Sequence, residues 1–102
     1  MKECCKKYLN EQFGDDAEVV DAIYAEYVSS VIAKMAEADA ALAAGSWDVL
    51  SRAAHTIKGN ALAAGDQQMG NTAMELQRAA KLEERDQSKQ LIADLKALME
   101  QL

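Results

Sequence analysis

Residues 46–66 read SWDVLSRAAHTIKGNALAAGD and carry the clearest structural signal in the chain. Apolar residues recur there every three or four positions, which is the period of one face of an α-helix. Gly65 ends the pattern, and Asp66 can cap a further helix directly after it. The stretch therefore predicts the first helix of a tight helical hairpin. Its apolar face consists of Trp47, Leu50, Ala54, Ile57, Ala61 and Ala64.

The same period divides the residues before this stretch into two helices. A first segment at about residues 2–13 ends at Gly14, and Asp15 then stands three residues before Glu18, the spacing of a capping box. The long helix predicted after this box ends at Gly45, a good C-terminal cap. Its apolar stripe is Val20, Ile23, Tyr24, Tyr27, Val28, Val31, Met35, Ala38 and Leu42.

Polar capping residues delimit the helices from residue 46 onward. Ser46 can cap the helix of the hairpin, Asp66 the next one, and Asp86 the last, after the pattern breaks near residues 84–86. Short connections force sequential helices to run antiparallel. We therefore predict an all-α fold for residues 1–102 as a single domain: an up-down antiparallel four-helix bundle with an additional short N-terminal helix. The last two apolar stripes are Met69, Ala73, Leu76 and Ala80, and Leu91, Leu95, Leu98 and Leu102.

Composition supports this architecture and excludes several classes of function. The chain has 102 residues, no proline and a net charge of −6. Proline is the worst helix former, so its absence favours helix throughout. The acidic balance argues against nucleic acid and against an anionic membrane surface as partners. We expect a monomer, because four helices within one chain close their own core.

The N-terminal residues predict neither a disulfide nor a metal site. Cys4 and Cys5 are adjacent, and no second cluster of Cys or His accompanies them. Charged residues rather than an apolar run follow Met1, which is unlike a signal peptide. We therefore expect reduced thiols and a cytoplasmic protein.

The chain contains one histidine, His55, and the helical period predicts that it is exposed. At 100° per residue, His55 projects roughly 130° away from the centre of the apolar face. Ser51, Gly59 and Leu62 project close to it. A surface histidine by itself has no predicted role, so its neighbours carry the interpretation.

Three neighbours favour a functional site at His55. Gly59 lies one turn further on the same face, and its lack of a side chain keeps one edge of the imidazole open. Lys58 lies on the adjoining side, where it can offset added negative charge. Gln77 lies at the same level as His55 across the predicted hairpin, where its amide can bond a ring nitrogen and fix the tautomer. These positions favour a histidine that receives an anionic group.

The residues near His55 are mainly basic, whereas the whole chain is acidic. Arg52, Lys58, Arg78 and Lys81 are all predicted near it, with Asp48 as the nearby exception. A basic patch on an acidic protein suggests an acidic docking partner or a phosphoryl group.

The run AHTIKG at residues 54–59 resembles the His-x-Leu/Ile-Lys-Gly signature of histidine phosphotransfer domains. The resemblance extends to residues 41–47, which are similar to the family's approach to the site. It also includes Gly65, ten residues after the histidine, and Gln77, where family members often have Gln or Glu. Two positions depart from the pattern: the family usually has a small residue at Leu62 and a larger apolar one at Ala64.

The resemblance implies a phosphoryl carrier with no kinase activity of its own. His55 would accept a phosphoryl group, through Nε2, from a hybrid sensor histidine kinase or receiver aspartate and return it to a response-regulator aspartate. Lys58, Gly59 and Gln77 would support the phosphohistidine. No cofactor is implied for this chain, and Mg²⁺ would sit on the partner receiver. The candidate docking face is Ser51, Arg52, Leu62, Arg78 and Lys81.

Two alternatives remain open from the residues alone. A helical bundle can bind a kinase or receiver without carrying phosphate, although it would not need His55, Lys58 and Gly59 together. The chain can also be part of a larger sensor kinase. A metalloenzyme or nucleophilic hydrolase is disfavoured, because one His without partnered Cys, Asp or Glu supports neither.

Overall fold

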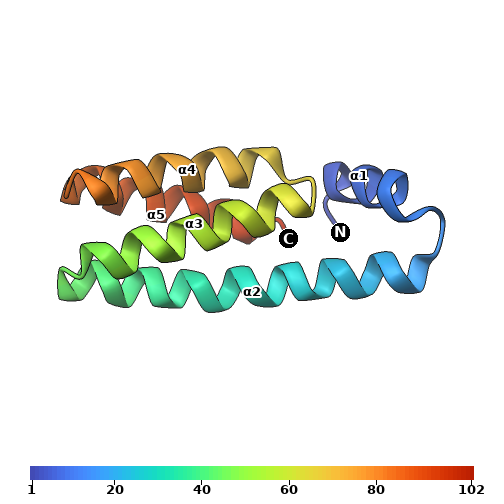
Figure 1. Ribbon diagram of the computed structural model, residues 1–102, viewed down its shortest axis with the longest axis horizontal. Helices are drawn as coiled ribbons and strands as arrows, with labels where there is room; N and C mark the ends of the chain where they lie inside the picture. Colours follow the sequence, from blue (N-terminus) through green and yellow to red (C-terminus); the bar gives the residue numbers. More distant parts are fainter.

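A computed structural model describes all 102 residues and contains five α-helices and no strand. The helices are α1 (Glu3–Phe13), α2 (Ala17–Ala44), α3 (Trp47–Ala63), α4 (Gln67–Lys81) and α5 (Arg85–Met99). Helices α2 to α5 run along the 44 Å long axis of the molecule (Figure 1). α2 and α4 each pack against both α3 and α5, which closes an antiparallel four-helix bundle. α1 lies at one end, beside the first turns of α2 and beyond the α3–α4 turn (Figure 1). The predicted all-α architecture is confirmed.

The cap of α2 differs from the predicted one by a single residue. Asp16, not Asp15, precedes the helix, and its Oδ1 accepts a hydrogen bond from the backbone N–H of Val19 at 3.3 Å. The chain reversal after α1 runs through Gly14 at φ +70° and needs one residue more than the capping-box spacing allowed. Ser46 does occupy the cap position of α3, but its side chain makes no capping hydrogen bond.

The last helix also begins earlier than predicted. α5 starts at Arg85 after Glu84, so Asp86 lies in the first turn instead of capping it, where its charge still suits the helix dipole. Arg85, the first residue of α5, reaches back to the end of α2, where its Nη1 donates to the carbonyl oxygen of Leu42 at 3.1 Å. Its guanidinium also lies 5.6 Å from the ring centroid of Trp47. Beyond the end of α5, Leu102 still packs against the core.

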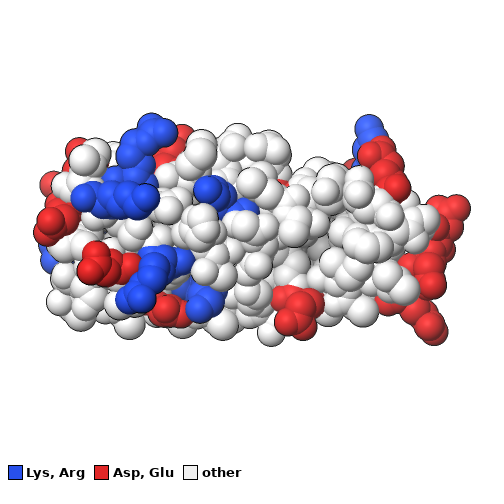
Figure 2. Space-filling view, viewed as in Figure 1, with Lys and Arg blue, Asp and Glu red and all other residues white.

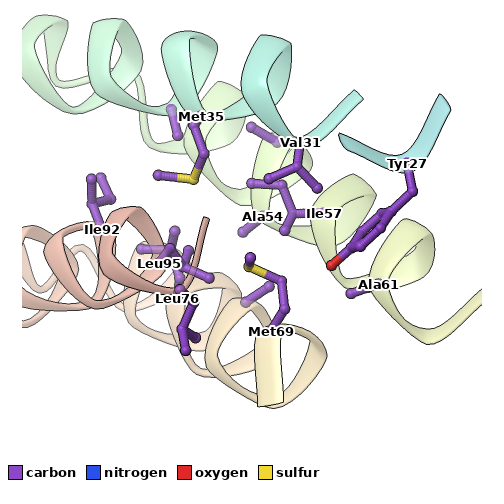
Figure 3. Packing of buried hydrophobic residues seen from close by; sticks show 14 of the residues in the cluster. Tyr27, Val31, Met35, Ala54, Ile57, Ala61, Met69, Leu76, Ile92 and Leu95 are labelled. Carbon is purple, nitrogen blue, oxygen red and sulfur yellow. The ribbon is translucent and has the colours of Figure 1, made fainter. Parts of the chain in front are cut away.

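The predicted apolar stripes meet in one core (Figure 3). Val31 and Met35 from α2, Ile57 from α3, Leu76 from α4 and Leu95 from α5 point toward one another there. The other core residues of α3 and α4 mostly have small side chains, and small side chains let two helix backbones approach closely. This close approach brings the outer edges of α3 and α4 within contact distance. The buried alanines of the two helices are Ala53, Ala54, Ala61, Ala73, Ala79 and Ala80.

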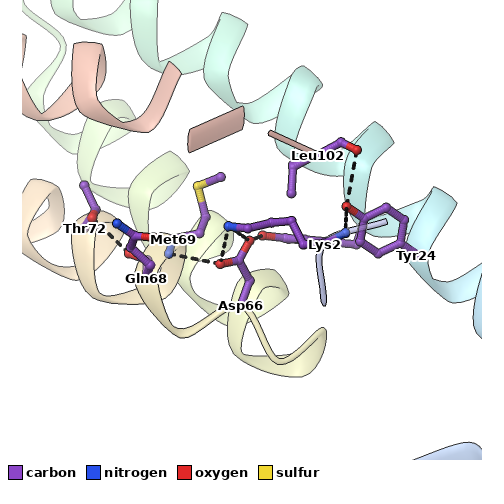
Figure 4. Close-up of polar contacts among 8 residues, drawn as sticks. Lys2, Tyr24, Asp66, Gln68, Met69, Thr72 and Leu102 are labelled. Atoms are coloured by element: carbon purple, nitrogen blue, oxygen red, sulfur yellow. Dashed lines mark hydrogen bonds and ion pairs between the residues drawn. The ribbon is translucent and has the colours of Figure 1, made fainter. Parts of the chain in front are cut away.

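Asp66 anchors the α3–α4 turn from a fully buried position. Its Oδ1 accepts the predicted capping bond from the Met69 N–H at 3.3 Å. The Nζ of Lys2 lies 3.0 and 3.1 Å from the two carboxylate oxygens (Figure 4). The Tyr27 hydroxyl donates to Oδ2 at 2.8 Å. Burial, followed by this hydrogen bond to a carboxylate, raises the pKa of Tyr27. One carboxylate thus joins the N-terminus, α2 and the turn.

Two further contacts close the same end of the bundle. The Tyr24 hydroxyl accepts a bond from the Lys2 backbone N–H at 3.2 Å and lies 3.4 Å from the carbonyl oxygen of Leu102, to which it donates (Figure 4). Tyr8 of α1 lies over Gly65, where an added Cβ would collide with the Tyr8 side chain. Gly65 also has φ +77°, so the turn requires glycine for two independent reasons.

The two cysteines of α1 should differ in reactivity. Cys4 is exposed, whereas Cys5 is fully buried. Burial, with a smaller contribution from Cys4 and Asp66, raises the pKa of Cys5 to about 12. We expect iodoacetamide at pH 8 to modify Cys4 alone in the native protein, as measured by mass spectrometry. Cys4→Ser should stay unmodified until it is unfolded; equal reaction at both thiols in the native chain would contradict this packing.

Candidate functional site

α3 presents His55 on its outer edge, next to α4. Ala54 and Ile57 on the same helix are fully buried, which fixes the rotation of α3 about its own axis. His55 is therefore exposed, as the helical period predicted. Its ring is accessible to a partner without any movement of the backbone.

Gln77 of α4 reaches His55 across the hairpin. The Gln77 Nε2 lies 3.4 Å from the His55 Nδ1, and the glutamine side chain is half-buried. His55 lies 11 residues before Asp66 and Gln77 lies 11 residues after it, so the pair follows from the register of an antiparallel hairpin. The amide is thus within reach of one ring nitrogen, Nδ1.

Gly59 leaves open space beside the imidazole. It is exposed, and a Cβ built on it would meet no atom within 4 Å. The absence of any close neighbour excludes a packing role for this glycine. A glycine in the middle of a helix costs about 1 kcal/mol relative to alanine, and no packing contact compensates for it here.

The basic residues predicted near His55 are free of ion pairs. The three ion pairs of the chain involve Lys2, Lys34 and Lys96 and leave out every cation of the candidate site. Those cations are Arg52, Lys58, Arg78 and Lys81. Lys58 is half-buried, and the other three are exposed. Unpaired cations contribute their full charge to the surface potential.

Two shallow hollows flank the site and share Lys81. One, of about 450 Å³, lies between the start of α3 and the end of α4, and Ser51 and Arg52 line it together with Lys81. The other, of about 360 Å³, is lined by Gln77, Arg78 and Lys81. Asp48 and Glu83 border the first hollow, so the surface is mixed there rather than uniformly basic.

The charge distribution is uneven along the molecule. Lys and Arg side chains gather over the half that holds the start of α3 and the end of α4, whereas Asp and Glu dominate the end near the α1–α2 connection (Figure 2). Asp and Glu side chains also lie among the Lys and Arg in that half, so the surface there is mixed, on a chain whose net charge is −6.

Leu62 lies on the same edge of α3, two turns beyond His55. Its side chain is 42% exposed. The rest of it rests on α4, because an added Cβ at Gly70 would meet the Leu62 Cδ2 at 2.9 Å and Cγ at 3.2 Å. The sequence singled out Leu62 but not Gly70, since the partner of an exposed leucine depends on how two helices pack.

No group of three or more His, Cys, Asp or Glu side chains is placed to hold a metal ion. None of the five helices combines the length and the apolar character needed to cross a bilayer. The site therefore consists of a histidine, an amide, an open glycine and free cations on one helical hairpin.

Comparison with protein families decides the class of this protein. The family model of the Hpt domain matches residues 22–102, which includes all of α3, α4 and α5. The chain belongs to the Hpt domain family. Hpt domains take part in histidine phosphotransfer in two-component signalling, as carriers rather than as enzymes, and they interact with receiver domains and kinases. No curated protein and no solved structure matches this Hpt domain significantly.

Proposed function

We propose that this Hpt domain carries a phosphoryl group on Nε2 of His55. It receives the group from the aspartate of a hybrid sensor kinase or receiver and passes it to the aspartate of a response regulator. The observation that carries the proposal is the pairing of an exposed imidazole with Gln77 on one edge and the empty space above Gly59 on another. We also infer that the carrier acts in the cytoplasm as a monomer.

The chemistry requires a neutral imidazole with a free lone pair on Nε2. A protonated imidazole has no lone pair on Nε2, so only the neutral ring is a nucleophile. Nε2 attacks the phosphorus of the aspartyl phosphate, the N–P bond forms, and the P–O bond breaks to release the aspartate carboxylate. Mg²⁺ on the receiver would supply most of the transition-state stabilisation. The Hpt domain contributes position, access and charge.

Gln77 would set the tautomer that this attack needs. Rotation of its amide by 180° places Oε1 near Nδ1, where it accepts the Nδ1–H bond. With the proton held on Nδ1, the Nε2 lone pair points outward. We expect Gln77→Ala to slow transfer about 3- to 10-fold, the range for loss of a hydrogen bond worth about 0.5–1.5 kcal/mol. Rapid-quench measurement of label transfer checks this, with Gln68→Ala on the exposed face of α4 as the matched control.

Gly59 would admit the approaching phosphoryl donor. Gly59→Gln should reduce the transfer rate about 100-fold, because a side chain there displaces the donor from its line of attack. The helical circular dichroism should stay unchanged or strengthen, since nearly every residue forms helix better than glycine. Gly59→Ala is the graded control, because a single methyl group has open space there. Normal transfer by Gly59→Gln would remove the access argument.

The free cations would serve the phosphorylated state and the docked partner. Lys58 offsets part of the charge that a phosphoryl group adds to His55. Arg52, Arg78 and Lys81, with Ser51 and Leu62, form the docking face. Because these cations are mostly exposed, their attraction for an acidic receiver should weaken as salt is added.

Incubation with a panel of phosphorylated receiver domains tests the proposal. We expect at least one receiver to transfer its label to the Hpt domain, and the label to be lost in acid and retained in base, as a phosphoramidate requires. A label lost in base would overturn the assignment to histidine, because Ser and Thr phosphates are acid-stable and base-labile and an acyl phosphate is labile in both. A receiver that binds tightly and transfers no label would favour an interaction module that carries no phosphate.

A further inference from the structure

Leu62 and Gly70 form a second row of the hairpin, equivalent to the row of His55 and Gln77. Each lies 4 residues from Asp66, on either side of it, just as His55 and Gln77 each lie 11 residues from it. The two rows are seven residues apart, which is two helical turns or roughly 10 Å. Leu62 therefore projects from the same edge of α3 as His55, and Gly70 occupies the position of α4 that Gln77 occupies in the first row.

In the second row, a recess at Gly70 takes the place of the polar contact between Gln77 and His55. Gly70 has no side chain, and the Leu62 side chain fills the space where its Cβ would be. Gly70 is itself buried, although it lies in the middle of the exposed hairpin edge. Leu62 thus lies close against α4, which we call its low position, and 42% of its surface is exposed. Any residue larger than glycine at position 70 would have to displace the end of the Leu62 side chain.

We propose that Gly70 is a positioning residue, which sets the height of Leu62 in the surface that a receiver covers. The inference rests on the proposed function, because it assumes that a receiver docks around His55. A low leucine offers an apolar surface without holding the partner away from the imidazole. A raised leucine would meet the partner before His55 does, and the spacing between donor and acceptor would increase.

Substitution of Gly70 by alanine tests this directly. The added Cβ is expected to displace the end of the leucine side chain and to leave the bundle intact, because alanine favours helix. We expect Gly70→Ala to weaken binding of the best phosphodonor receiver about tenfold, as measured by calorimetry, and to slow transfer to His55 by a similar factor. Gln68→Ala is the matched control and should change neither quantity.

A double substitution distinguishes an effect that acts through Leu62 from an effect on the α4 backbone. If Gly70 acts through Leu62, Gly70→Ala should have no further effect in a Leu62→Ala background, so the two changes are strongly non-additive. Additive losses would overturn the proposal, since they would place the effect in α4 itself. Nuclear Overhauser contacts from the Leu62 methyl groups to the α-protons of residue 70 and to neighbouring α4 residues supply a positional readout, and Gly70→Ala should change their relative intensities.

The outcomes distinguish this inference from the proposed function. If wild-type protein accepts label from a receiver and Gly70→Ala behaves like wild type, only the role of Gly70 is wrong. If wild-type protein accepts no label from any receiver, the proposed function fails first. A Gly70→Ala protein that binds additional, non-cognate receivers and keeps its cognate affinity would also contradict the proposal. In that case Leu62 would exclude those receivers sterically in the wild-type protein.

Discussion

Replacement of His55 by glutamine should abolish phosphorylation of the protein by receiver domains. Glutamine has similar length and can still hydrogen-bond Gln77, but it has no nucleophilic ring nitrogen. Because His55 is the only histidine of the chain, no second imidazole can form a phosphohistidine. Loss of label should exceed the effect of every other substitution at the site. Undiminished labelling of His55→Gln by a competent receiver would rule out the carrier function.

Binding of the receiver should survive this substitution. His55 is exposed and contributes nothing to the buried core, so His55→Gln should unfold at the same temperature as wild type. Calorimetric titration with the unphosphorylated receiver should give a dissociation constant within about threefold of the wild-type value. Loss of both binding and label would mean that the substitution disturbs docking, and Gln77→Ala would then be the sharper probe of the chemistry.

Replacement of Asp66 by alanine should destabilise the bundle by about 3 kcal/mol, the scale for breaking a buried ion pair. The change removes the α4 cap and leaves the Lys2 ammonium and the Tyr27 hydroxyl without their acceptor. For a chain of this length such a loss corresponds to a fall in Tm of roughly 15 °C. Thermal and urea unfolding followed by circular dichroism measure it.

Asp16→Ala is the matched control for Asp66. Both aspartates cap a helix with an N–H to Oδ1 distance of 3.3 Å, but Asp16 is exposed and has no ion-pair partner. Loss of an ordinary cap costs about 1 kcal/mol, so the difference between the two variants measures the buried contacts. Lys2→Met in the Asp66→Ala background should recover part of the loss, because it removes the stranded charge. Equal losses for the two aspartates would show that Lys2 and Tyr27 contribute nothing.

Much of the candidate site follows from local periodicity. Burial of Leu50, Ala54 and Ile57 sets the rotation of α3 and leaves His55 exposed. The apolar period of the sequence alone predicts each of these positions. The level of Gln77 follows from the position of a single turn, since residues at equal distances from that turn face each other in an antiparallel pair. The family signature then adds the chemistry, because exposure alone does not tell a functional histidine from an idle one.

Sequence periodicity predicts the helix boundaries less accurately than the helix faces. The structure moves the cap of α2 from Asp15 to Asp16 and starts α5 before Asp86. A capping residue is chosen by the geometry of the chain reversal and by what the first turn can reach. Arg85 reaches a carbonyl oxygen 43 residues earlier in the chain, and no local pattern contains that partner.

The sequence by itself determined the helices, their faces, the exposure of His55 and the register of the hairpin, because these depend on periods of a few residues and on one turn. Only the tertiary structure decided that Asp66 is a buried centre joining Lys2 and Tyr27, and that Leu62 lies in the recess left by Gly70. Those contacts depend on how far apart two helices pack and on which distant side chain fills the space between them. Interhelical distance is a property of the whole core, set by every small residue in it at once.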